Sequence, residues 1–407
     1  MASPLTCPYC YRKIVERQVM FRCSGINGPR GKCRTAADRV LAAHMGDHDA
    51  QYPAFTADGR RLKAVHEECG AETHHRICPH CHSRLPVHFG RSDGKLIALV
   101  GAKYSGKTVY MTVLLHELLH GVGERFGTAL LAEDEWTQTH FEEDYEKRLY
   151  ERGELHSPTR TAAARNGGVA RPLVFSFSVS PPAGRLRRFG GDRVDRTVLS
   201  FFDTAGEDLD NQTSVDQNVR YLSSADGVIL LLDPLQMRGA RPLVSAGTDL
   251  PEPAPAATSP VNVLTRITTL LHQGKETKRG GLIGTPIAVA FSKMDTLWPA
   301  LAEGSPLRAA PPTTPAFHVP DSLAVHGHVQ ALVHEWAGRN LDEALRSNYK
   351  RYRYFGLSAL GQSPQADGAA PRVSKLGVQP WRVEDPLLWL LSEFGTIGRI
   401  TRETGRG

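Results

Sequence analysis

Leu96-Ile-Ala-Leu-Val-Gly-Ala-Lys-Tyr-Ser-Gly-Lys-Thr108 is the stretch of sequence that decides the fold. Its apolar first part predicts a buried strand, residues 101–108 read G-x-x-x-x-G-K-T, and a helical pattern follows over Val109–His120. Glycines in such a loop let the backbone wrap a polyphosphate, and the N–H groups of the following helix point at the anion. The stretch therefore predicts an α/β fold that holds a nucleoside triphosphate where this strand ends.

Two side chains of this loop carry chemistry. Lys107 is predicted to reach the outer phosphates and Thr108 to offer its hydroxyl to Mg²⁺, while Gly101 and Gly106 give the backbone its freedom. The competing interpretation is a glycine-rich turn between a strand and a helix that binds nothing. The order of later motifs argues against that interpretation.

Two further strands follow along the chain. Arg196–Asp203 runs into Thr204-Ala-Gly206, so that Asp203 can hold Mg²⁺ through water and the Gly206 N–H can touch the γ-phosphate. Gly227–Asp233 is apolar over nearly its whole length, which is typical of a strand buried on both faces of a sheet. We assign no chemistry to that second strand.

The next two strands precede loops that suit a guanine base. Pro286–Phe291 leads into Ser292-Lys293-Met294-Asp295. The Asp295 carboxylate can accept both the ring N–H and the exocyclic amine of guanine, a pair that adenine cannot donate, and the Lys293 stem can pack over the base. Arg351–Phe355 leads into Ser358-Ala359-Leu360, whose N–H groups could meet the guanine oxygen, although a plain loop after a strand is the competing interpretation.

The order of these motifs, phosphate loop, D-T-A-G, S-K-x-D and S-A-L, resembles the Ras-like P-loop GTPases over roughly residues 94–400. More narrowly, the chain is similar to bacterial double-GTPase-type proteins with an N-terminal zinc ribbon, a group encoded in actinobacterial genomes for which signalling or conflict roles are suspected. The resemblance implies a three-layer P-loop NTPase sandwich with a mostly parallel sheet, GTP or GDP with Mg²⁺, and GTP hydrolysis. The nucleotide contacts that it implies are Gly101, Lys103, Tyr104, Ser105, Gly106, Lys107, Thr108, Val109, Asp203, Gly206, Lys293, Asp295, Ser358, Ala359 and Leu360.

Three residues depart from the family pattern. Ser292 stands where Asn or Thr is usual, which we expect to weaken a strut to the phosphate loop. Lys103 adds charge near the γ-phosphate or, as we slightly prefer, points to solvent. Glu207 stands where many relatives carry the Gln that orients the attacking water, so we expect slow hydrolysis, of order 10⁻⁴ to 10⁻² per second, until a partner or an arginine in cis completes the site.

Residues 121–195 should contain the switch that senses magnesium. Ala132–Arg152 has apolar residues at helical spacing and predicts an amphipathic helix packed on the domain. Thr159 is our choice for the threonine that closes on Mg²⁺, and Thr161 is the alternative. Arg160 between them is an arginine finger or, as we favour, a solvated loop residue.

All seven cysteines lie between Cys7 and Cys81. A C-x-x-C turn grips one metal ion with two thiolates, and the segment contains two C-P-x-C turns. Seven ligands are one short of two tetrahedral sites, so His66, three residues before Cys69, is predicted to supply the eighth. The predicted zinc ligands are Cys7, Cys10, Cys23, Cys33, His66, Cys69, Cys78 and Cys81.

Spacing leaves the grouping of these ligands open. Sequential grouping puts Cys7, Cys10, Cys23 and Cys33 on one zinc and His66, Cys69, Cys78 and Cys81 on the other, whereas crossed grouping puts the two C-P-x-C turns on one metal. Disulfides are the rival explanation. We expect thiolates instead, because no signal peptide precedes the cysteines and a phosphate-loop enzyme works in a reducing cytosol.

Charge and composition narrow the partners. Residues 1–95 hold 15 Lys and Arg against 9 Asp and Glu and the remainder is balanced, so the net charge of +6 lies in this part. Two zinc ions bound by seven thiolates would halve that excess, and no stripe of aromatic and basic residues accompanies it, so a protein-docking or structural platform is favoured over nucleic-acid binding. With no run of about 20 apolar residues, we expect a cytoplasmic protein without a membrane span.

We expect two domains. A zinc-ribbon-like domain over residues 1–90 needs its metals because so small a domain buries little apolar area, and a GTPase domain over residues 91–407 carries insertions at about 121–195, 236–262 and 300–320. The remaining expected elements are a strand at Pro172–Val179 that pairs with Val198–Asp203 and helices at Val261–Gln273, Ser322–Tyr349 and Asp385–Phe394. Two alternatives stay open: an ATPase with Asp203 as the Walker B acid, and a nucleic-acid-binding or adaptor protein with a vestigial nucleotide pocket.

Overall fold

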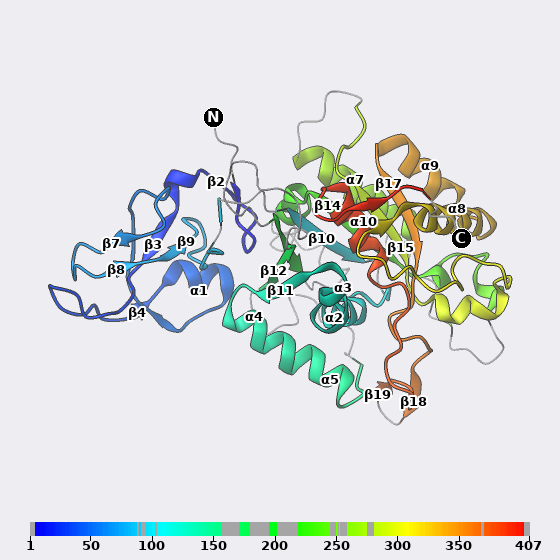
Figure 1. The fold of residues 1–407 in the computed structure, drawn as a ribbon, viewed down its shortest axis with the longest axis horizontal. Coiled ribbons are helices and arrows are strands. Elements are labelled where there is room, and N and C mark those ends of the chain that lie inside the picture. The colour runs from blue at the N-terminus through cyan, green and yellow to red at the C-terminus, as the bar shows by residue number, and fades with distance from the viewer. Residues whose placement is uncertain are drawn as a thin grey trace.

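A seven-stranded sheet forms the centre of the molecule (Figure 1). The computed structural model describes residues 5–87, 89–90, 95–101, 104–155, 171–179, 195–201, 219–244, 250, 252, 259–274, 281–367 and 370–402. The strand order is β11-β12-β13-β10-β14-β15-β17. The bounds are β10 Leu96–Gly101, β11 Thr128–Ala132, β12 Leu173–Val179, β13 Asp195–Phe201, β14 Gly227–Leu232, β15 Ile287–Phe291 and β17 Tyr352–Gly356.

Only β12 runs against the direction of the other strands of this sheet. β10 pairs in parallel with β13 and β14, β14 with β15, and β15 with β17, whereas β12 is antiparallel to both β11 and β13. The parallel strands therefore end at one edge of the sheet, and the chain crosses from one side of β10 to the other between β13 and β14. Ligands of open α/β sheets bind where the strand order reverses in this way.

Helices cover both faces of the sheet and make it the middle of three layers. Along β10, Leu96 and Ala98 face one hydrophobic core, and Ile97 and Leu99 face a second. The first core includes residues of α7, α8 and α9, and the second includes residues of α2 and α10. The helix bounds are α2 Lys107–Glu117, α3 Gly123–Phe126, α4 Glu135–His140, α5 Lys147–Tyr150, α7 Pro260–Gly274, α8 Val319–Glu335, α9 Arg339–Asn348 and α10 Asp385–Glu393.

Shorter elements connect these helices and strands. Two π-helical turns matter below: η2, Leu118–Val122, continues α2 into α3, and η3, Phe141–Glu146, joins α4 to α5. The remaining short elements are η6 Pro234–Gln236, η7 Arg241–Leu243, η9 Met294–Ala300, β16 Phe317–His318, β18 Gln365–Asp367, β19 Ala370–Arg372 and β20 Arg399–Ile400. Within the described ranges no helix is long and apolar enough to cross a membrane.

The structure differs from the sequence expectations in two elements. β11 was not expected, and it adds a strand beside β12 within the predicted insertion. The helix expected over Ser322–Tyr349 is two helices, α8 and α9, because Ala337 has φ 64°, in the left-handed region, and the Gly338 N–H donates to the Val333 carbonyl at 2.8 Å, which ends α8. Of the two differences, β11 arises from pairing with a distant part of the chain, which local periodicity does not report.

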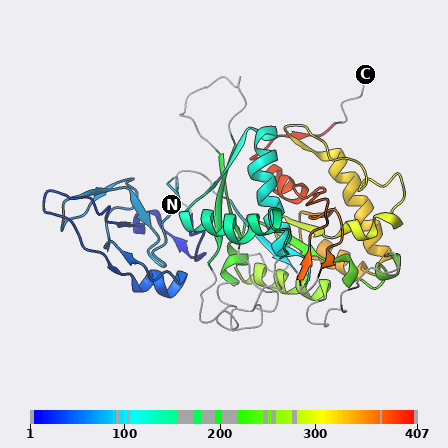
Figure 2. The ribbon, with the colours of Figure 1, turned by 90° about the horizontal axis from the view of Figure 1, so that it is seen from below.

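Residues 5–87, here called the N-terminal module, lie at one end of the long axis of the molecule (Figures 1 and 2). Their strands are two or three residues long, and a buried cluster at the core of the module includes four cysteines together with Tyr9, Ile14 and Leu41. So little apolar area fits the expectation that metal holds this part together. The bounds are β1 Leu5–Thr6, β2 Lys13–Ile14, η1 Glu16–Gln18, β3 Met20–Arg22, β4 Ala36–Ala37, α1 Arg39–Met45, β5 Ala50–Gln51, β6 Ala54–Phe55, β7 Ala64–Val65, β8 Glu72–Thr73 and β9 His75–Ile77.

Two buried tyrosines of the first C-P-x-C turn attach this module to the rest of the chain. The Tyr9 hydroxyl donates to Asp134 Oδ2 at 2.7 Å, and the hydroxyl oxygens of Tyr11 and Ser200 lie 2.9 Å apart. The Tyr11 ring also packs on Tyr221 with centroids 4.9 Å apart. The module is therefore packed directly against β13 and the start of α4.

Candidate functional site

The phosphate-loop motif lies between β10 and α2. Gly106 precedes α2 with φ 75°, and Tyr104 has φ 64°, so two residues in the left-handed region turn the chain from strand to helix. A Cβ on Gly101 would lie 2.4 Å from the Ser105 Oγ atom. Glycine is thus required at 101 by close approach and favoured at 106 by conformation.

This loop fits a polyphosphate in two respects. The first turn of α2, which begins at Lys107 and Thr108, contains no acidic residue of its own, and the N-terminus of a helix carries a partial positive charge that favours an anion. Ser105 is 1% exposed, and within the described part of the chain its hydroxyl has no hydrogen-bond partner. A buried donor without a partner is costly, and a phosphate oxygen would satisfy it.

Ser292 connects the loop after β15 to the phosphate loop. Its Oγ lies 2.8 Å from the Ser105 carbonyl oxygen and 3.1 Å from the Leu232 carbonyl oxygen, and its single hydroxyl proton can be donated to one of them at a time. Although Asn or Thr is usual at this position in the family that the sequence resembles, the serine hydroxyl still reaches the phosphate loop.

Lys293 makes the second connection. Its ammonium donates to the Tyr104 carbonyl oxygen at 2.7 Å and pairs with Asp233 Oδ2 at 2.7 Å. Asp233 is fully buried, and its other oxygen accepts the Leu235 N–H at 2.8 Å. The sequence analysis assigned no role to Asp233. Its position directly after a strand buried on both faces could have indicated an ion pair, because a buried carboxylate needs a partner.

Asp295 lies at the start of η9, two residues beyond Lys293. The Ser358 hydroxyl donates to its Oδ1 atom at 2.5 Å, and the Met294 N–H donates to the Leu357 carbonyl at 3.1 Å, so the two loops expected to meet a base are held together. Burial raises the pKa of the Asp295 carboxyl, and the bond from Ser358 opposes that shift.

Of the three N–H groups expected near the guanine oxygen, one is occupied. The Ser358 N–H donates to the Trp381 carbonyl at 3.0 Å. Among the described residues, no hydrogen bond from the N–H of Ala359 or Leu360 is present. Ala359 and Leu360 are therefore better candidates for a base contact than Ser358.

Replacing Lys293 by Met is expected to lower the free energy of unfolding by about 2 kcal/mol, because it removes the partner of the buried Asp233 carboxylate. This loss is smaller than for a fully buried ion pair, because the Lys293 side chain is 37% exposed. Chemical denaturation measures this change. The double variant Lys293→Met/Asp233→Asn should recover the stability, since Asn keeps an acceptor for the Leu235 N–H without the charge. A double variant as unstable as the single one would contradict the assigned pair.

Several predicted site residues lie outside the described residues: Lys103, Thr159, Asp203, Gly206 and Glu207, and with them Arg160 and Thr161. The structure brings together the phosphate-loop residues from Tyr104 to Val109 with Lys293, Asp295 and Ser358. Lys107 and Thr108 begin α2 at this edge of the sheet. The roles of all these residues stay predictions.

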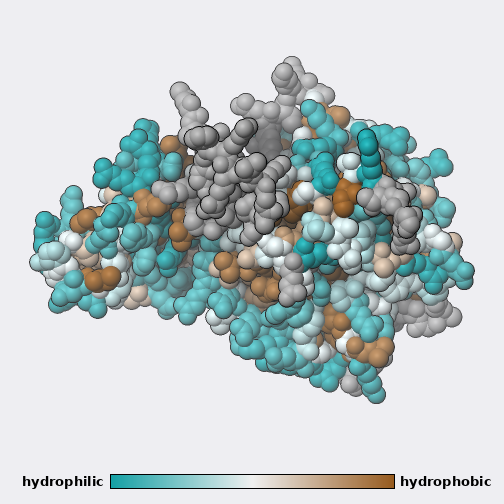
Figure 3. All heavy atoms as spheres, in the orientation of Figure 1, coloured by the Kyte–Doolittle hydropathy of each residue, from teal (hydrophilic) through white to brown (hydrophobic). Residues whose placement is uncertain are grey.

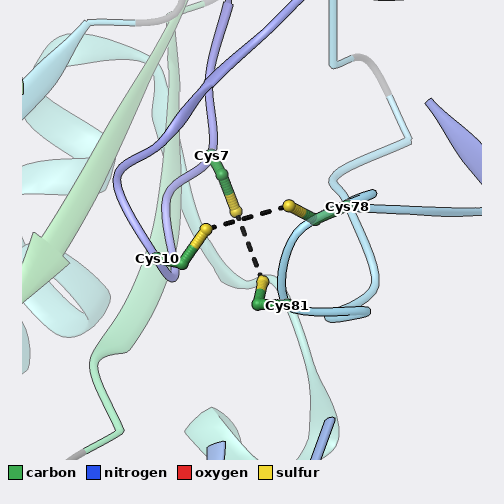
Figure 4. A group of neighbouring side chains, drawn as sticks. All are labelled: Cys7, Cys10, Cys78 and Cys81. Atoms are coloured by element: carbon green, nitrogen blue, oxygen red, sulfur yellow. Dashed lines mark hydrogen bonds between the residues drawn. The ribbon is translucent and has the colours of Figure 1, made fainter. Parts of the chain in front are cut away.

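The cysteines form two clusters with crossed grouping. Cys7, Cys10, Cys78 and Cys81 make the first cluster, in which Cys7 and Cys81 sulfurs lie 3.8 Å apart, as do those of Cys10 and Cys78 (Figure 4). A tetrahedral zinc with Zn–S bonds of about 2.3 Å separates its sulfurs by about 3.8 Å, whereas a disulfide joins them at about 2 Å. All seven cysteines are free thiols, so the rival disulfide interpretation is wrong for this structure.

The second cluster contains Cys23, Cys33, His66 and Cys69. The sulfurs of Cys23 and Cys69 are 3.7 Å apart, and His66 Nδ1 lies 3.3 and 3.4 Å from the sulfurs of Cys33 and Cys69. His66 thus lies with three cysteines in this cluster and completes the eight candidate donors. The sequential grouping is wrong because β3 pairs with β9, which brings the second C-P-x-C turn, immediately after β9, back to the first.

Solved structures that resemble this chain include two GTPase-type proteins, both at low sequence identity. The chain is similar to the signal recognition particle receptor SRb-GTP/SRX complex from Chaetomium thermophilum, at 14% identity over 69% of this chain and 94% of the other, with a TM-score of 0.27. It is also similar to the S. cerevisiae Ski7 GTPase-like domain bound to GDP and inorganic phosphate, at 10% identity over 74% of this chain and 50% of the other, with a TM-score of 0.31. Because these TM-scores are low, the class of fold rests on the strand order and loops described above.

One curated relative is more similar in sequence. The chain is 27% identical over 337 residues, 79% of its own length and 80% of the other, to a Mycolicibacterium smegmatis protein named "Putative ESX-1 scaffolding and assembly protein SaeC". No family model matches the chain.

Proposed function

We propose that this chain is a Mg²⁺-dependent GTP-binding protein that changes conformation with the state of its nucleotide and hydrolyses GTP slowly. In this proposal Lys107 neutralises charge on the β- and γ-phosphates, and Thr108 binds Mg²⁺ directly. Thr159 and Asp203 complete the magnesium shell, and Glu207, beside the Gly206 that senses the γ-phosphate, accounts for the slow reaction. When bound, Mg²⁺ would offset the charge that develops on the phosphates.

One observation carries the proposal: the Lys293 ammonium joins the phosphate loop, through the Tyr104 carbonyl, to the segment that contains Asp295. A phosphate-binding loop and a candidate base-binding carboxylate are thereby held in one site. Three further observations support the same conclusion. The buried Ser105 hydroxyl has no hydrogen-bond partner among the described residues, the first turn of α2 contains no acidic residue, and the Ser292 hydroxyl contacts the phosphate loop.

Guanine is the base that this arrangement favours. An ionised Asp295 accepts two N–H groups from guanine, whereas it would face a lone pair of adenine. The Ser358 hydroxyl satisfies and orients Asp295 Oδ1, and the N–H of Ala359 or Leu360 is available for the guanine oxygen. The alternative of an ATPase lacks such a reason for the half-buried Asp295 carboxylate.

The N-terminal module would hold two zinc ions and act as a platform for protein partners. The donor sets and spacings of both cysteine clusters fit tetrahedral zinc. In Figure 3 the surface of this module is mainly hydrophilic, with hydrophobic residues scattered among polar ones. The relative from M. smegmatis is named a scaffolding and assembly protein, which supports docking of protein partners rather than of nucleic acid.

Titration calorimetry on the zinc-replete chain, with GTP, GDP, ATP and xanthosine triphosphate and with or without Mg²⁺, tests the proposal. GTP and GDP should bind, and Lys107→Ala should weaken GTP binding at least about 100-fold, because a charge-assisted contact to each of two phosphates is lost. Lys350→Ala, which removes an exposed lysine beyond α9, is the matched control and should bind GTP as the parent does.

Three results would contradict this function. Tight ATP binding with no preference for GTP would favour the ATPase. Binding of RNA or DNA that survives Lys107→Ala and weakens steeply with salt would favour the nucleic-acid alternative. The absence of heat with every nucleotide would refute a functional pocket.

A further inference from the structure

Two histidines and a glutamate meet on the side of α2 that faces the α4–η3–α5 helix. His116 Nδ1 lies 2.7 Å from Glu146 Oε1, and His120 Nε2 lies 3.2 Å from the same oxygen. One candidate ligand atom from each residue lies within 4.8 Å of the others. These three residues, here called the His-Glu cluster, lie outside the two cysteine clusters and take no part in the proposed nucleotide site.

Sequence and backbone both set this cluster apart from an ordinary surface ion pair. Residues 116–120 read His-Glu-Leu-Leu-His, and the spacing H-x-x-x-H puts both rings on one side of a helix. The same letters form the H-E-x-x-H pattern in which two histidines hold zinc, a signal that the sequence analysis above did not use. π-Helical turns are rare and concentrate at functional sites; η2 contains His120, and η3 ends at Glu146.

The donor set suits a borderline divalent metal ion. Two imidazole nitrogens and one carboxylate oxygen are the protein ligands of a common class of zinc site, which leaves a fourth position to water. Bonds of about 2.0 to 2.1 Å in a tetrahedral site separate such donors by about 3.3 Å. The distance of 3.2 Å to His120 already matches, and the 2.7 Å hydrogen bond of His116 would lengthen by about 0.6 Å when a metal replaces its proton.

The His-Glu cluster is exposed to solvent on one side and covered by an aromatic ring on the other. The His120 side chain is 59% exposed, whereas the His116 ring is covered by the Tyr150 ring at a centroid distance of 3.7 Å. A metal ion can therefore enter from solvent past His120. Because Tyr150 covers the inner side of the cluster, the contacts support metal binding rather than a cleft for hydrolysis.

We propose that His116, His120 and Glu146 form a third metal site, which binds Zn²⁺ or a similar divalent transition-metal ion. His116 follows Lys107 by nine residues, so the site lies about 14 Å along α2 from the phosphate loop. A bound ion would cross-link the helix that begins at the phosphate loop to the α4–η3–α5 helix, which these side chains now connect through hydrogen bonds. The proposal does not depend on nucleotide binding.

Metal titration of the full-length protein, with both cysteine clusters already loaded with zinc, tests this site. Calorimetry with Zn²⁺ should show one additional equivalent, and added Co²⁺ should give the visible bands of nitrogen and oxygen ligation without sulfur-to-cobalt charge transfer. His120→Gln removes an exposed ligand, so it should fold normally and weaken this binding at least tenfold. Glu146→Gln should weaken it as well.

The matched control is His140→Gln. His140 Nδ1 also pairs with a carboxylate, Asp144 Oδ2 at 2.5 Å, and stacks on an aromatic ring, Trp136, but among the described residues it belongs to no cluster of possible metal ligands. This variant should bind the extra ion as the parent does. The proposal is overturned if the zinc-loaded parent takes up no further ion, or if His120→Gln binds it as tightly as the parent.

Discussion

Replacing Cys78 by Ser is expected to release one of two zinc ions and to unfold the N-terminal module together with its contact to the sheet. Structural zinc contributes about 10 to 16 kcal/mol in small domains, and the four buried sulfurs of the first cluster would lose the zinc ion that we propose they bind. The melting temperature should fall by more than about 10 °C. Elemental analysis counts the zinc, and calorimetry or circular dichroism follows unfolding.

The first cysteine cluster should affect the rest of the chain more than the second. The Cys7–Cys10 turn contains Pro8, whose carbonyl accepts from the Ser200 hydroxyl of β13 at 3.0 Å, and Tyr9, which bonds Asp134. The second cluster packs only against neighbours within the N-terminal module among the described residues.

Cys33→Ser is therefore the matched control for Cys78→Ser. It should also release one zinc ion, yet leave the unfolding of the central sheet nearly unchanged. Equal destabilisation of the sheet by both variants would contradict this difference, and two zinc ions retained in both would refute the assigned ligands.

Replacing Asp295 by Asn is expected to weaken GTP binding by about 10² to 10⁴-fold and to improve binding of xanthosine triphosphate. Each hydrogen bond to an ionised acceptor contributes about 1.5 to 3 kcal/mol, and guanine would lose two of them. Asn presents one N–H group to guanine where an acceptor is needed, whereas xanthine offers an oxygen at that position. Calorimetric titration with both nucleotides measures the change.

The fold should tolerate this substitution. Burial raises the pKa of Asp295, which means that the folded state disfavours the ionised carboxylate and that a neutral amide relieves this cost. For the same reason, acidification should protonate Asp295 and weaken GTP binding at a higher pH than for an exposed carboxyl group. Lost affinity with unchanged stability would separate base recognition from folding.

Asp226→Asn is a suitable control because Asp226 lies before β14, at the opposite edge of the sheet, where it accepts the Leu96 N–H at 3.0 Å. GTP binding should be unchanged in this variant. If Asp295→Asn left GTP affinity unchanged as well, guanine recognition by this carboxylate would be wrong and the ATPase alternative would gain support.

Sequence patterns predicted the elements of the fold that depend on neighbouring residues. β10 and α2 flank the phosphate loop as the motif required, and β12 pairs with β13 as the alternation of Pro172–Val179 suggested. β14 is buried throughout, as its apolar composition indicated. β11 was missed because it depends on pairing with a segment far away in the chain. The break between α8 and α9 is local, since Ala337 is in the left-handed region, and Gly338 was the signal that could have predicted it.

The sequence by itself determined which side chains are candidates for binding phosphate, guanine and zinc, because each short motif joins residues only a few positions apart. Tertiary structure decided which of them act together. The β3–β9 pairing contributes to the grouping of the eight candidate zinc donors, and the parallel alignment of β14 and β15 brought Asp233 to Lys293. The packing of α2 against η3 joined two histidines to Glu146. Such pairings follow from strand order and helix packing, which are properties of the whole chain.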